Sequence, residues 1–74
     1  MNNDNLVRMV NRIGTFFGSM PDRQEALEGI AMHIQRFWEP RMRRQLMEHI
    51  DNEGSAELTS MVAEAIGTHR SMLA

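Results

Sequence analysis

The chain has 74 residues, which supports one domain, and its lack of cysteine excludes disulfides, thiolate metal sites and thiol catalysis. Its formal charge of −2 is unevenly distributed: all eight basic residues are arginine, four of them lie in residues 36–44, and residues 48–64 carry five acids and no base. A domain this small has a limited core, so we expect it to rely on well-packed helices, on self-association or on a partner.

Apolar residues recur at helical spacing along the chain and never alternate as in a strand. They predict a single all-α domain over residues 1–74, a compact array of three to four short helices. The predicted helices are roughly 5–18, 23–38, 40–51 and 56–68. No secretory signal or run of about 18 apolar residues is visible, so we expect a cytoplasmic protein without a membrane segment.

Polar residues at the expected helix ends define the boundaries of the first two helices. Asp4 is the expected N-cap of the first helix, which the segment 18–21 ends. Asp22 and Glu25 have the spacing of a capping box at the start of the second helix. That helix should stop near residue 38, because Pro40 pushes the preceding residue away from helical angles.

The second half of the chain gives similar signals. Pro40 suits the first turn of the third helix, which the segment 51–54 should end. Ser55 is the expected N-cap of the fourth helix, with Glu57 in its first turn. Gly67 and the residues after it are expected to fray.

The sequence offers no set of residues for catalysis. It lacks a glycine-rich phosphate loop, and its serines lack an activating context. His33 lies beside the apolar stripe and is expected to be packed or interfacial. His49 is interpreted as a solvated residue near a helix C-terminus rather than as a metal ligand. We therefore expect a chain that is not an enzyme and binds no metal or cofactor itself.

The segment 36–44 combines adjacent aromatic rings, a proline corner and four arginines, residue types that are enriched at binding hot spots. Trp38 fits the buried stripe, which leaves Phe37 as the better interface candidate. Phe17 likewise fits a stripe and Phe16 does not. Together with the eight methionines, these residues favour an exposed apolar contact patch. The predicted partner-binding residues are Phe16, Arg36, Phe37, Trp38, Pro40, Arg41, Arg43 and Arg44.

The arginines also pose an electrostatic problem. Arg41, Arg43 and Arg44 fall in the first turn of the third helix, where positive charge opposes the helix dipole. We expect acids of this chain or of a partner to compensate them.

Two stretches of the sequence resemble the delta subunit of soluble NAD-dependent formate dehydrogenases. They are Leu6–Phe17, with the sequence LVRMVNRIGTFF, and Gly29–Arg44, with the sequence GIAMHIQRFWEPRMRR. The Arg-Phe-Trp-x-Pro-Arg-Met-Arg core of the second stretch is the most specific part. The resemblance covers about the first two-thirds of the chain, and the part after Asp51 contributes little to it.

The resemblance implies a non-catalytic accessory role. Enzymes of this kind oxidise formate and reduce NAD with a catalytic (alpha) subunit that carries a molybdenum or tungsten pterin. Their other subunits carry flavin and iron–sulfur clusters. The delta subunit is expected to bind the catalytic subunit and to assist assembly, cofactor insertion or stability.

Two alternatives remain open on the residues alone. One is a self-associating helical protein, which the surplus apolar surface supports, and self-association of the isolated chain is compatible with the accessory role as well. The other is a nucleic-acid-binding helical module, supported by the arginine cluster and by the helix-turn-helix length of the second and third predicted helices. The net negative charge opposes this second alternative, so we expect no nucleic-acid partner.

Overall fold

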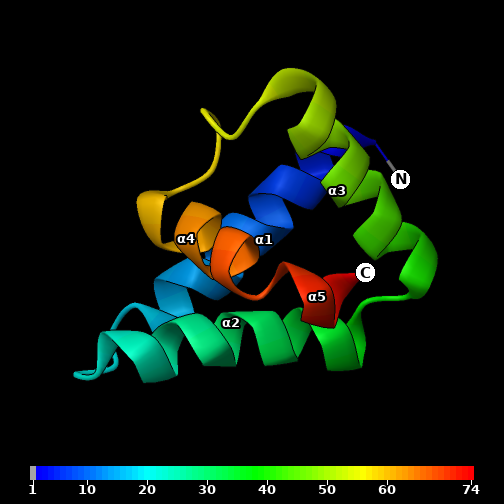
Figure 1. Ribbon diagram of the computed structural model, residues 1–74. Helices are drawn as coiled ribbons and strands as arrows, with labels where there is room; N and C mark the ends of the chain where they lie inside the picture. The colour runs from blue at the N-terminus through cyan, green and yellow to red at the C-terminus, as the bar shows by residue number, and fades with distance from the viewer. Residues whose placement is uncertain (1) are drawn as a thin grey trace.

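The computed structural model describes residues 2–74, which form five helices and no strand (Figure 1). The helices are α1 (Asn3–Phe17), α2 (Arg23–Phe37), α3 (Pro40–Glu53), α4 (Ser60–Thr68) and the short α5 (Arg70–Leu73). The predicted all-α class is confirmed, with one short helix more than expected. Within the described part of the chain, no helix is long and apolar enough to cross a membrane.

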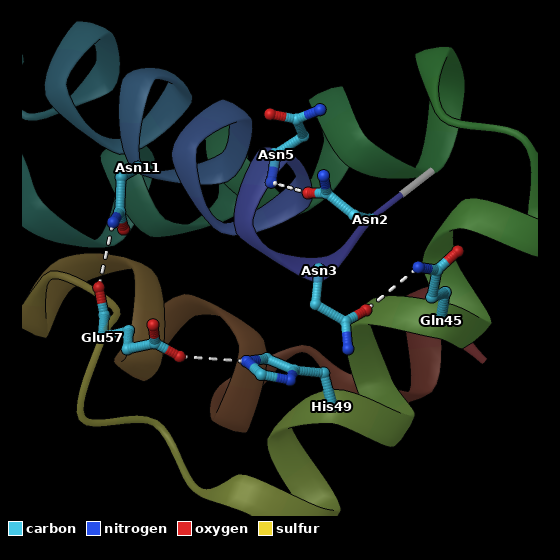
Figure 2. A network of polar contacts seen from close by, with 7 residues as sticks. All are labelled: Asn2, Asn3, Asn5, Asn11, Gln45, His49 and Glu57. Carbon is cyan, nitrogen blue, oxygen red and sulfur yellow. Dashed lines mark hydrogen bonds and ion pairs between the residues drawn. The ribbon is translucent and has the colours of Figure 1, made fainter.

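The N-cap of α1 differs from the predicted one. Asn2 caps the helix, because its side-chain Oδ1 accepts a hydrogen bond from the backbone N of Asn5 at 2.8 Å (Figure 2). Asp4 instead lies in the first turn, where its negative charge still suits the helix dipole. Asp22 is the N-cap of α2, as predicted, because its side chain accepts a hydrogen bond from the backbone N of Glu25 at 3.2 Å.

The start of the fourth predicted helix is wrong by several residues. Ser55 lies in a loop, and the N-cap of α4 is Thr59, whose Oγ1 accepts from the Val62 backbone N at 3.3 Å. Gly54 has a φ of +86°, a left-handed conformation that ends α3. The chain changes direction at this residue, and the next helix does not begin directly after it.

Tertiary hydrogen bonds hold the loop of residues 54–59 in place. Asn11 of α1 donates from Nδ2 to the Glu57 backbone oxygen at 3.0 Å, and its Oδ1 accepts from the Thr59 backbone N at 3.0 Å. His49 of α3 contacts the Glu57 carboxylate through Nε2 at 3.1 Å (Figure 2). The His49 side chain is only 12% exposed, so its interpretation as a solvated residue was wrong.

The C-terminal residues form a helix instead of fraying. Leu73 of α5 is fully buried, and α5 packs against α2 and α4. Arg70 donates two hydrogen bonds to the Asp51 carboxylate, at 3.0 and 2.8 Å, which tie α5 to the end of α3. A buried leucine and a two-point ion pair hold this segment, and neither is visible as local helix propensity.

The core lies where α1, α2 and α4 meet, with α3 and α5 closing its other sides (Figure 1). Its fully buried large side chains are Leu6, Val10, Ile30, Ile34, Leu46, Val62 and Leu73. Gly14 allows α1 and α4 to approach closely, because a Cβ at this position would lie within 2.4 Å of Val62 Cγ2. The core therefore depends on a small residue in the interior of α1.

Candidate docking surface

The two adjacent aromatic pairs each divide between the core and the surface. Trp38 is 6% exposed and belongs to the core, whereas the neighbouring Phe37 is 72% exposed. Phe17 packs partly against the core, whereas Phe16 is 73% exposed. Phe16 and Phe37 are the exposed large hydrophobic residues among residues 2–74. Burying them would release apolar surface from water, which is a driving force for association.

Four rings connect the ends of these two helices into one surface feature, which we call the aromatic strip: Phe16, Phe17, His33 and Phe37. The Phe16 and Phe17 rings meet edge to face, with centroids 5.1 Å apart. The Phe17 and His33 centroids are 6.1 Å apart, and those of His33 and Phe37 are 4.8 Å apart. The strip therefore runs from α1 across to α2.

The helix geometry explains how the strip forms. Gly29, His33 and Phe37 follow one another at four-residue steps, so they lie on one face of α2. Gly29 leaves room for the Phe17 ring, because a Cβ at this position would lie 2.6 Å from two of its carbon atoms. Phe17 can thus rest on the backbone of α2 and meet His33.

Two shallow hollows lie along the aromatic strip. Arg12, Ile13 and the rings of Phe16, Phe17 and His33 line the first. The second is lined by Phe17, Gly29, Met32, His33, Arg36 and Phe37. Each hollow thus combines an apolar floor with one arginine. This combination suits an apolar side chain with a nearby negative charge.

Arg43, predicted to bind a partner, makes its contacts within the chain. Its Nη1 donates to the backbone oxygens of Gln35 at 2.9 Å and of Trp38 at 3.1 Å. These carbonyls lie at the negative C-terminal end of α2, where a cation is favourable. One of the three arginines near the start of α3 is therefore compensated by backbone carbonyls rather than by acids. Its Nε is buried without a hydrogen-bond partner in the described residues.

The predicted binding residues fall into three groups in the structure. Phe16, Arg36 and Phe37 meet at the aromatic strip, whereas Pro40, Arg41 and Arg44 are exposed along the first turns of α3. Trp38 and Arg43 support the structure from inside.

The sequence did not lead us to predict that Arg12 lines this surface or that the His33 ring connects Phe17 with Phe37. The signal for each was its four-residue spacing from a phenylalanine, Arg12 from Phe16 and His33 from Phe37.

Between residues 2 and 74, no group of three or more His, Cys, Asp or Glu side chains is arranged to hold a metal ion. The hollows are open surface features, and their lining is mainly apolar or basic.

The fold and this surface define a small helical protein with an exposed, arginine-bordered aromatic face, a composition typical of protein-binding surfaces. A comparison with family models identifies the family, because the model of the NADH-dependent formate dehydrogenase delta subunit, FdsD, matches residues 5–66. The chain belongs to this family. The match includes the whole aromatic strip and excludes α5. No curated protein and no solved structure matches the chain.

Proposed function

We propose that this chain is a non-catalytic accessory subunit that binds the catalytic subunit of a molybdenum- or tungsten-containing formate dehydrogenase. The proposal includes the cytoplasmic location expected for the soluble enzymes that the sequence resembles. In this role the chain assists assembly, cofactor insertion or stability. Pterin, iron–sulfur clusters and flavin then belong to the partner subunits, and this chain binds none of them.

The observation that carries the proposal is the exposure of Phe16 and Phe37 on one continuous strip in a chain of the delta-subunit family. Two phenylalanines that are more than 70% exposed are costly for an isolated small domain, because their apolar surface stays in water. A partner that covers the strip would remove this cost.

Purification of a tagged copy from its native cells tests this function. We expect a large molybdenum- or tungsten-containing subunit to co-elute, with formate-dependent NAD reduction in the eluate. Deletion of the chain should lower the amount of assembled, cofactor-loaded enzyme. Recovery of the tagged chain alone, with unchanged enzyme in the deletion strain, would contradict the accessory role and favour self-association.

The nucleic-acid alternative receives less support. A helix-turn-helix module needs its two helices packed on each other. Here α3 packs mainly on α1, while α2 makes its main contacts with α1, α4 and α5. The proposed partner is therefore a protein.

A further inference from the structure

Among residues 2–74, the Arg, Asp and Glu side chains that line the two hollows of the aromatic strip are both arginines. Arg12 lines one hollow and Arg36 lines the other, and no Asp or Glu among residues 2–74 lines either. Arg23 and Arg70 form ion pairs with acids of this chain, whereas Arg12 and Arg36 form none with any described residue. Two cations beside an apolar surface thus remain available to an external group.

This charge pattern disfavours a second copy of the chain as the occupant of the strip. In a two-fold symmetric dimer through this surface, the same patch faces itself. Arg12 and Arg36 of one copy would then lie on the same interface as Arg12 and Arg36 of the other, and like charges brought together at an interface are repulsive. A partner with negative charges at the matching places fits the surface better.

We propose that the aromatic strip receives a segment of the catalytic subunit that carries two apolar side chains, one for each hollow, and a carboxylate beside each of Arg12 and Arg36. This inference rests on the proposed function and specifies its interface. The ring-to-ring steps of 5.1, 6.1 and 4.8 Å make the strip short. About three turns of a helix, at roughly 5.4 Å per turn, would cover it.

Affinity measurements on the complete chain with the purified catalytic subunit test this inference. Arg12→Glu and Arg36→Glu should each weaken binding at least about tenfold, because each variant places like charges together. Phe16→Ser and Phe37→Ser should have effects of the same order. All four residues are exposed, so circular dichroism should show unchanged helicity.

Arg8→Glu is the matched control, since it makes the same change in net charge one turn from Arg12. Arg8 is exposed, lies outside both hollows of the strip and, among the described residues, hydrogen-bonds Asn5. We expect binding within about twofold of the wild-type chain. An Arg8→Glu effect as large as that of Arg12→Glu would indicate general charge attraction and would overturn the local contact.

A photo-crosslinking amino acid at position 16 or 37 identifies the occupant. The expected product is a peptide of the catalytic subunit with apolar residues and nearby Asp or Glu. Replacing that acid by arginine should restore binding to the Arg12→Glu or Arg36→Glu variant. A crosslinked peptide without acids would overturn the proposed chemistry.

The outcomes separate this inference from the function on which it rests. If the wild-type chain does not bind the catalytic subunit, the proposed function fails. If it binds and the four strip variants bind equally well, the function stands and the strip is not the interface. Sedimentation of the free chain and flotation with phosphatidylglycerol vesicles test the other occupants. A dimer or vesicle complex that the Phe37→Ser variant abolishes, while binding to the catalytic subunit persists, would also overturn the inference.

Discussion

Aromatic rings and arginines have different surroundings on two sides of the molecule. The first side is the face formed by the ends of α1 and α2, and the second is the side closed by α3, α4 and α5. On the first, Phe16 and Phe37 stay exposed, and Arg12 and Arg36 have no acid of the described chain beside them. On the second, polar contacts are made within the chain, as between Arg70 and Asp51. The difference shows that the exposed large aromatic rings of residues 2–74 are concentrated on one surface rather than spread evenly.

The first and largest test of this comparison uses two adjacent residues. Trp38→Ala removes a core side chain, and we expect a loss of about 3–5 kcal/mol in the free energy of unfolding. A domain of this length has a total of roughly 4–11 kcal/mol, so much of the variant should be unfolded at 37 °C. Phe37→Ala should change stability by less than about 0.5 kcal/mol. Urea denaturation followed by circular dichroism measures both, and equal losses would contradict the division of this pair.

The second test concerns the closing side. Leu73 is fully buried although it is the second-to-last residue of the sequence. Leu73→Ala should lower the free energy of unfolding by about 2–4 kcal/mol, because it opens a cavity beside α2 and α4. Ser71→Ala, at an exposed position of the same helix, is the control and should have little effect. If Leu73→Ala is as stable as the wild-type chain in urea, α5 does not contribute to the core.

These positions also show what the sequence could predict. Helical periodicity placed Trp38 and Phe17 toward the core and left Phe37 and Phe16 outside, because it reports which residues share a face. Asp22 was predicted as a cap, because capping acts within three residues.

The misplaced features depend on contacts between distant residues. The start of α4 depends on Asn11, 48 positions away from Thr59, and the packing of α5 depends on a core that exists only after folding. In the aromatic strip, the contact between Phe17 and His33 depends on how α1 crosses α2. Local propensity carries no information about such pairings.

The third test examines the close packing between α1 of the first side and α4 of the second side. Gly14→Ala places a methyl group against Val62, which is fully buried and has little freedom to move. We expect the free energy of unfolding to fall by about 1–3 kcal/mol because of overpacking, although alanine has a better helix propensity than glycine. Gly67→Ala in α4 is the matched control, because a Cβ at Gly67 has nothing within 4 Å. The free energy of unfolding of that variant should rise by up to about 1 kcal/mol. Thermal unfolding of both variants would show whether Gly14→Ala is destabilising while Gly67→Ala is stabilising.

The fourth test separates the arginines of the α3 start. Arg43→Ala removes the two hydrogen bonds to the end of α2, and we expect the free energy of unfolding to fall by about 1–2 kcal/mol. Arg41→Ala and Arg44→Ala remove exposed side chains that form no ion pair with any described residue, and they should change stability by less than about 0.5 kcal/mol. If all three variants unfold at the same urea concentration, Arg43 has no special structural role.

The smallest expected effect is the pH dependence of the ion pair that ties α5 to α3. The hydrogen bond from the Arg70 guanidinium holds the pKa of Asp51 below its ordinary value. The folded protein therefore binds the Asp51 proton less tightly than the unfolded chain, and this contribution to stability is complete above the unfolded pKa of about 3.9. It is lost as the pH falls through the lower pKa of the folded state.

The Asp51→Asn variant isolates this contribution. At about pH 7 its melting temperature should lie a degree or two below that of the wild-type chain, because both groups of the pair are exposed and screened. The difference should shrink toward zero as the pH falls through the lowered pKa of Asp51 in the folded protein, because the wild-type carboxylate then becomes neutral as well. A difference that stays constant as the pH falls through this range would mean that the charge of Asp51 does not hold α5. The closing side would then depend on the burial of Leu73 rather than on the ion pair.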